Sequence, residues 1–213
     1  MNISAQADLS KILSALKALH RAFPIEQRLK IQACDSSRET YLAALTRWMR
    51  TSSAPAPAGF DAEALEELMA LDALYFTEDE QAIGVPPFCP VETDIAVHFP
   101  HEKLYAVSAI DALALPRILT SAATIETFCP VSGQPIQIRV DAQGAPFESD
   151  QDKAIVVFRK ISDDPKHYVA DVAPGIRFVQ PALASQFPQQ LTLAEAAAVA
   201  HGFYAFQRKM FQP

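Results

Sequence analysis

The chain has 213 residues, 50% hydrophobic and 20% charged, a composition typical of a soluble globular protein of one or two domains. Residues 1–60 carry eight Lys and Arg against four Asp and Glu, a net +4, and residues 61–213 carry ten against twenty-one, a net −11. Because nucleic-acid-binding faces are basic, this acidic body argues against a general nucleic-acid-binding protein and leaves only a weak DNA-binding alternative for the amino-terminal part.

The three cysteines, Cys34, Cys89 and Cys129, are far apart and odd in number, and they form no C-x-x-C pair. The sequence therefore indicates neither a disulfide framework nor a zinc site, and it favours a reducing compartment. The first residues lack the basic and apolar regions of a signal peptide, and no apolar run approaches the ~18 residues of a membrane span. We expect a cytoplasmic protein with no cofactor and no membrane partner; the sequence does not reveal its oligomeric state.

The amino-terminal part is predicted to be helical. Apolar residues recur at helical spacing over 8–22, and Pro24 can open a second short helix because proline suits a first turn. Ser36 or Ser37 can cap a third helix over 38–49. The next segment, TSSAPAPAG, has the composition of a linker.

A helix capped by Asp61 is expected over 62–74. A polar turn and two strands follow, at 77–81, 83–85 and 93–99. Helices followed by a hairpin are typical of a winged-helix-like domain, so we predict one in this part of the chain.

An almost continuous apolar segment at 102–116 predicts a helix buried on most sides. Leu104, Ser108, Asp111 and Leu115 follow the spacing that places residues on one helix face. Burial among leucines would raise the pKa of Asp111 and make it a proton donor near neutral pH. The structural alternative is a carboxylate that caps backbone N–H groups or pairs with an arginine.

The second half is expected to contain short strands and a terminal helix, at 124–128, 136–140, 154–159, 176–180 and 193–210. The predicted fold class is α+β, with an N-terminal helical, winged-helix-like region followed by a small mixed β-sheet flanked by helices. Arg177, on a predicted core strand, is a candidate counter-ion for Asp111 or an anion anchor for a substrate. The aromatic group Phe203, Tyr204 and Phe206 is interpreted as core packing.

The central segment resembles the catalytic helix of the alkylmercury (organomercurial) lyases, through LYA at 104–106, SAID at 108–111, and Pro116. The turn CPVSGQP at 129–135 resembles the family's C-x-x-T-G-x-P turn. Weaker similarities are to the family's wing and late core strand, at 77–80, 92–93 and 176–179. The likeness runs from about residue 60 to the carboxyl terminus. Together with the helical pattern and the linker, it leads us to predict an N-terminal helical segment at 1–50, a linker at 51–60, a winged-helix-like remainder at 61–100 and an alkylmercury-lyase-like core at 101–213.

The resemblance implies a cytoplasmic enzyme that breaks carbon–mercury bonds by protonolysis. In that family two cysteine thiolates bind the mercury, a soft ion that prefers sulfur ligands, and an aspartate relays a proton to the departing carbon. Asp111 matches this aspartate, whereas the two cysteine positions match Ser108 and Ala173. A serine hydroxyl is a hard, protonated donor, so we expect a small-molecule ligand or a reaction that has diverged from the family's.

Two alternatives remain open. Cys89, in the loop that links two predicted strands, could approach Asp111, and Cys129 matches a family cysteine that is interpreted as structural; either would allow a working organomercurial lyase with rearranged thiols. The other alternative is a non-enzymatic binding or regulatory module that uses the amino-terminal helices, with Arg38, Arg47 and Arg50 facing outward.

Overall fold

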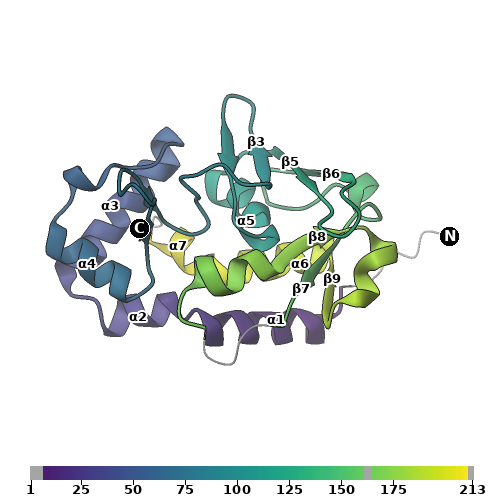
Figure 1. Ribbon diagram of the computed structural model, residues 1–213, viewed down its shortest axis with the longest axis horizontal. Helices are drawn as coiled ribbons and strands as arrows, with labels where there is room; N and C mark the ends of the chain where they lie inside the picture. Colours follow the sequence, from purple (N-terminus) through teal and green to yellow (C-terminus); the bar gives the residue numbers. More distant parts are fainter. Residues whose placement is uncertain (1–6, 161–164, 211–213) are drawn as a thin grey trace.

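The computed structural model describes residues 7–160 and 165–210, and its fold is α+β, as predicted (Figure 1). The helices are α1 (Leu9–Ala22), α2 (Ile25–Ile31), α3 (Asp35–Thr51), α4 (Ala62–Ala70), α5 (Ala109–Leu119), α6 (Leu193–Phe203) and α7 (Ala205–Lys209). The strands are β1 (Tyr75–Phe76), β2 (Ile83–Gly84), β3 (Ala96–His98), β4 (Lys103–Tyr105), β5 (Ala123–Phe128), β6 (Pro135–Val140), β7 (Ile155–Phe158), β8 (Ile176–Val179) and β9 (Gln189–Thr192). Short helical turns lie at η1 (Pro57–Gly59), η2 (Glu148–Asp150), η3 (Tyr168–Val172), η4 (Ala173–Gly175) and η5 (Pro181–Gln186).

The strands form a four-stranded sheet in the order β4-β3-β5-β6, a three-stranded sheet in the order β8-β7-β9, and the ribbon β1-β2. Every strand pair in the described residues is antiparallel, whereas the sequence analysis predicted a mixed sheet. The burial pattern of β6 explains the pairing, because Ile136, Ile138 and Val140 are buried and alternate with exposed residues. Such alternation is typical of antiparallel sheets that pack one face on the core.

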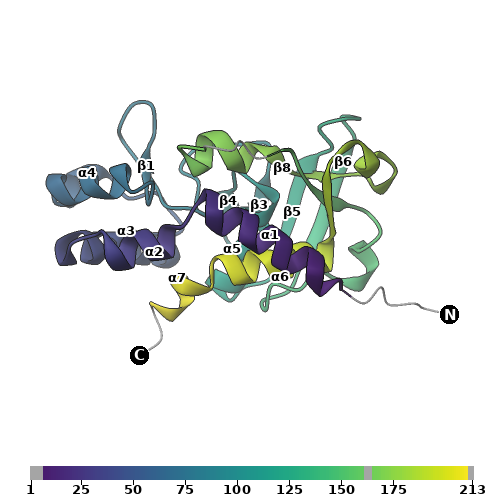
Figure 2. The same cartoon turned by 90° about the horizontal axis from the view of Figure 1, so that it is seen from below.

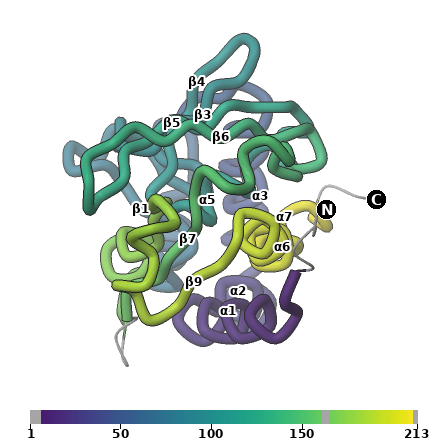
Figure 3. The backbone as a smooth tube through the Cα atoms, turned by 90° about the vertical axis from the view of Figure 1, so that its right-hand side faces the viewer, coloured from purple at the N-terminus to yellow at the C-terminus, as the bar shows by residue number. Residues whose placement is uncertain are grey.

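Helix α5 lies at the centre of the fold. Figure 3 shows it between the four-stranded sheet and α6, with α1 on the far side of α6. Nine of its eleven residues are buried, which agrees with the apolar segment seen in the sequence. Figure 2 shows α1 running along α6. The backbone N–H of Asp8 donates to Glu195 at 2.8 Å, and Leu16 lies against Gly202.

The helix predicted over 102–116 begins later than expected. Lys103–Tyr105 form β4, in which Leu104 pairs with Val97, and α5 starts only at Ala109. Leu104 is therefore not on the helix, and Ser108 stands at its cap with an extended backbone. Ser108 and Asp111 are still neighbours, but through helix capping rather than through a shared helix face.

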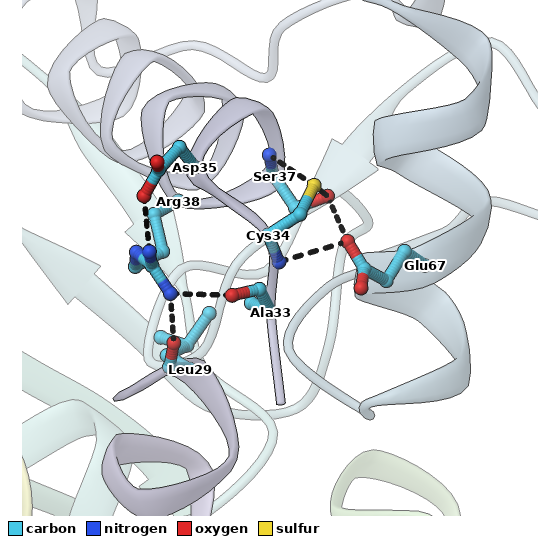
Figure 4. A network of polar contacts seen from close by, with 7 residues as sticks. All are labelled: Leu29, Ala33, Cys34, Asp35, Ser37, Arg38 and Glu67. Carbon is cyan, nitrogen blue, oxygen red and sulfur yellow. Dashed lines mark hydrogen bonds and ion pairs between the residues drawn. The ribbon is translucent and has the colours of Figure 1, made fainter. Parts of the chain in front are cut away.

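The cap of α3 also differs from the prediction. Neither Ser36 nor Ser37 is the N-cap; Cys34 is, and its sulfur accepts a hydrogen bond from the backbone N–H of Ser37 at 3.4 Å (Figure 4). The Ser37 hydroxyl and the Cys34 N–H both donate to Glu67 of α4. These contacts tie the start of α3 to its neighbouring helix and extend α3 to Asp35.

The predicted helices of the winged-helix-like region are present as α2, α3 and α4, and the assignment as a winged helix stays a prediction. The two strands predicted at 83–85 and 93–99 do not pair with each other. Instead β2 pairs with β1, and β3 pairs with β4 and β5. The four-stranded sheet therefore crosses the domain boundary that we predicted at residue 100. The predicted terminal helix is divided at Tyr204 into α6 and α7, and β9 precedes it unpredicted. Among the described residues, no helix combines the length and apolar character needed to cross a membrane.

Candidate functional site

Asp111 lies in the first turn of α5, where Ser108 and Asp111 cap each other. The Asp111 backbone N–H donates to Ser108 Oγ at 3.0 Å, and the Ser108 N–H donates to Asp111 Oδ2 at 3.1 Å. This capping box satisfies two backbone donors that the helix itself leaves unpaired. Both residues are at most 1% exposed, so the cap also fixes the carboxyl group inside the protein.

Two tyrosines hold the other carboxyl oxygen. Tyr168 of η3 and Tyr204, which follows α6, both donate to Asp111 Oδ1, at 2.7 and 2.5 Å. The Tyr168 ring stacks on Phe23 of the α1–α2 connection with a centroid separation of 4.6 Å, and Tyr204 packs edge-on against Phe203. Three distant parts of the chain thus converge on one carboxyl group.

Burial raises the pKa of Asp111 to about 6, although hydrogen bonds from Tyr204, Tyr168 and Ser108 favour the charged form and oppose the rise. Burial and the nearby Asp111 charge raise the pKa of both tyrosine hydroxyls well above the ordinary value, so these groups remain donors. The arrangement can accept and release a proton near neutral pH, which is what a general acid requires.

A thiol lies in the same neighbourhood. Cys89 belongs to the loop between β2 and β3, bridges to Tyr105 of β4, and donates through its thiol to the Val91 carbonyl at 3.3 Å. Burial raises the pKa of the Cys89 thiol, and the Asp111 charge raises it further, whereas the Tyr75 hydroxyl beside the sulfur lowers it. Of the two buried cysteines, Cys89 is the one whose thiol pKa responds to the Asp111 charge.

The remaining predicted residues lie elsewhere. The Arg177 guanidinium on β8 pairs with Asp94, and no ion pair in the described residues joins it to Asp111, which corrects the expected counter-ion role. Cys129 is buried at the turn between β5 and β6; burial opposes its ionisation, but hydrogen bonds from the Ser132 hydroxyl and nearby backbone lower its pKa overall. Ala173 is buried in η4 and supplies no polar side-chain atom.

Tyr168, Tyr204 and Tyr75 were not predicted as site residues. Tyr204 was interpreted as core packing together with Phe203 and Phe206. Tyr168 and Tyr75 belong to no recognisable sequence motif. Their distance from Asp111 along the chain left no local signal.

The described residues contain no group of three or more His, Cys, Asp or Glu side chains placed to hold a metal ion. Four surface hollows lie away from Asp111, on the outer face of α3, at the ends of α3, α5 and α7, beside α2, and between α1 and β9. At 1% exposure, Asp111 is reached by a ligand only when the packing around it opens.

Comparison with known proteins agrees with the motif around Asp111. The sequence pattern of the alkylmercury lyase family matches residues 88–180, a segment that includes Cys89, the capping box and Tyr168. Residues 88–180 of the chain are thus similar to the alkylmercury lyase family. The family resemblance predicted from the sequence is therefore confirmed.

A solved structure supports the fold over nearly the whole chain. The crystal structure of the mercury-bound form of MerB2 is similar with a TM-score of 0.67 and 16% identity, over 93% of this chain and 99% of that one. At this identity the likeness shows the fold alone. No curated protein matches the sequence of this chain.

Proposed function

We propose that this alkylmercury-lyase-family protein binds a small ligand beside Asp111 and uses Asp111 as a proton donor in a reaction that has diverged from two-thiolate cleavage of carbon–mercury bonds. The observation that carries the proposal is the buried Asp111 carboxyl group, held by Ser108, Tyr168 and Tyr204 and with a pKa of about 6. A proton donor with a pKa near the working pH is the most effective general acid.

The proposed divergence is supported by the side chains at the two positions where the family resemblance implies thiolates. The Ser108 hydroxyl accepts from the Asp111 N–H as a helix cap, and Ala173 has no donor atom. Neither can bind a soft metal, which prefers thiolate ligands. MerB2 is known in a mercury-bound form, so an organomercurial is the first compound to test here.

The test is incubation of the purified protein with phenylmercuric acetate and an excess of a small thiol, with benzene release followed by gas chromatography. We expect release at the rate of the thiol-only control, for both the natural protein and Asp111→Asn. In parallel, protein labelled with 13C-aspartate is expected to show one carboxyl signal that titrates near pH 6 and is absent in Asp111→Asn. Benzene release that depends on Asp111 would overturn the divergence, and the absence of that titration would overturn the proton-donor role.

A second candidate is a working organomercurial lyase that uses Cys89. It is favoured by the position of the Cys89 thiol, which lies beside Tyr75 and within the influence of the Asp111 charge. In this case benzene release would be lost in Cys89→Ser and kept in Cys129→Ser, which removes another buried thiol. Equal loss, or no release from any variant, excludes it.

The proposal includes a cytoplasmic location, supported by three cysteines that are all free. It does not include a nucleic-acid partner. The exposed carboxylates of α4 and of the β1–β2 turn would repel a phosphate backbone; they are Glu63, Glu66, Glu78, Asp79 and Glu80.

A further inference from the structure

The start of η3, the segment that carries Tyr168, is held by a carboxylate from a distant part of the chain. The Tyr168 backbone N–H donates to Asp72 Oδ2 at 2.8 Å, and His167 Nδ1 lies 3.4 Å from Asp72 Oδ1. The N–H groups of Lys166 and His167 both donate to Asp171 of η3 itself, each at 2.9 Å. Within residues 7–160 and 165–210, Asp72 is therefore the acceptor that ties the backbone at the start of η3 to another part of the fold.

The local backbone and a neighbouring arginine keep Asp72 in position. Asp72 follows α4 and has a φ of 58°, a left-handed conformation that Asp, Asn and Gly adopt more readily than other residues. Arg28 of α2 donates to the Leu71 carbonyl at 2.9 Å, and its guanidinium lies 3.9 Å from Asp72 Oδ2. The Asp72 side chain is 12% exposed, so solvent competes weakly for its hydrogen bonds. The contact with η3 thus links the amino-terminal helices to the candidate site.

Tyr168 connects Asp72 to Asp111. Its N–H is bound to the first carboxylate, and its hydroxyl donates to Asp111 Oδ1 at 2.7 Å. Its ring is buried, stacks on Phe23 and lies 5.8 Å, centroid to centroid, from the ring of Phe203. Because the tyrosine ring is rigid, a displacement of η3 would withdraw the hydroxyl from Asp111. The same displacement would open a path from solvent to this buried carboxyl group.

We propose that Asp72 is a positioning residue of the candidate site, whose carboxylate holds η3 in place so that Tyr168 stays on Asp111 and the site stays closed. Release of the Asp72 contact lets η3 move away and admits a ligand to Asp111. Helices α2 and α4 therefore act on the site from a distance, through Arg28 and Asp72. The inference rests on the proposed function, because it concerns how a ligand reaches the same carboxyl group.

The test is amide hydrogen exchange, followed by NMR, in the whole chain and in two substitutions of Asp72. Asp72→Gly keeps the left-handed backbone and removes the acceptor, whereas Asp72→Asn keeps both the backbone and an acceptor oxygen. The reporters are the N–H groups of Ser108 and Asp111, which are bonded within the capping box and not to Asp72. We expect their exchange to become about tenfold faster in Asp72→Gly, as for the loss of one hydrogen bond to a charged group. In Asp72→Asn it should remain within about twofold of the natural rate.

Two further measurements identify the movement of η3 as the cause. Tyr168→Phe removes the hydrogen bond at the other end of the same residue and should speed the exchange of the same two N–H groups. An unchanged rate in Tyr168→Phe would show that η3 is not the segment that moves. The N–H of Ile138, a buried residue of β6, should exchange at the natural rate in every variant, because the four-stranded sheet takes no part in this local opening.

Asp61→Ala is the matched control. Asp61 also accepts a backbone N–H, that of Ala64 at 2.8 Å, but it does so at the opposite end of α4. The loss of this cap weakens α4 without touching η3, so the exchange of Ser108 and Asp111 should stay unchanged.

The proposal is overturned if Asp72→Gly speeds the exchange of Ser108 and Asp111 no more than Asp61→Ala does. It is also overturned if Asp72→Asn exchanges as fast as Asp72→Gly, or if Ile138 accelerates to the same extent. When any of these results is found while Asp111 still titrates near pH 6, the role of Asp72 fails and the proposed proton donor stands.

Discussion

Asp111→Asn should change how the stability of the protein depends on pH. The carboxyl pKa is raised from 3.8 to about 6 in the folded protein. The folded state therefore holds a proton that the unfolded state releases between about pH 4 and pH 6, and stability falls as pH rises through this interval. A shift of about two units at about 1.4 kcal/mol per unit corresponds to about 3 kcal/mol.

The asparagine side chain cannot titrate, so the free energy of unfolding of the variant does not fall as pH rises from about 4 to about 6. Its amide also disturbs the hydrogen bond from the Ser108 N–H, at a cost of about 1–3 kcal/mol that does not vary with pH. The free energy of unfolding of both proteins is measured by urea denaturation from pH 4 to pH 7.5. We expect the variant to gain about 3 kcal/mol relative to the natural protein across this range. A difference that is constant with pH, or that moves the other way, would refute the assigned burial and pKa of Asp111.

Three further substitutions test the packing by urea denaturation. Tyr204→Phe removes one of the two phenol donors to Asp111; it should cost about 1.5–3 kcal/mol at pH 7.5, and carboxyl NMR should show a higher pKa for Asp111. Gly144→Ala should destabilise by about 2 kcal/mol more than Gly133→Ala, because both glycines have positive φ but only a Cβ at residue 144 would meet the partly buried imidazole of His201; equal costs would contradict this packing. Trp48→Phe removes the indole hydrogen bond to the β2 backbone and should cost about 1–3 kcal/mol, and no loss would show that this carbonyl has another partner.

The sequence was sufficient to predict the burial of Asp111, because apolar residues flank it on both sides along the chain. It did not locate the helix start correctly, since a short apolar run such as 104–107 fits a buried strand as well as a helix. The pattern Ser108-x-x-Asp111 is itself a capping signature, and it marks the true beginning of α5.

The partners of Asp111 could not have been predicted from local patterns. Tyr168 lies 57 residues and Tyr204 93 residues away along the chain, and only the packing of η3 and α6 around α5 brings them together. The place of Arg177 on a core strand was predicted correctly, but its partner depends on the position of Asp94 in a loop of the other half. The hydrophobic periodicity of a sequence predicts which face of a helix or strand is buried, but it does not predict which residues of other elements pack against that face.

The contact of α1 with α6 has a consequence for how the protein is made. The hydrogen bond from Asp8 to Glu195 joins residues separated by 187 positions, so α1 must wait until α6 has been synthesised before the two helices can pack together. At about 5–20 residues per second this delay is about 10–40 s, during which the side of α1 that packs on α6 has no partner in that helix. The packing of α1 onto α6 is therefore a late step in folding, because it joins parts of the chain that are far apart in sequence.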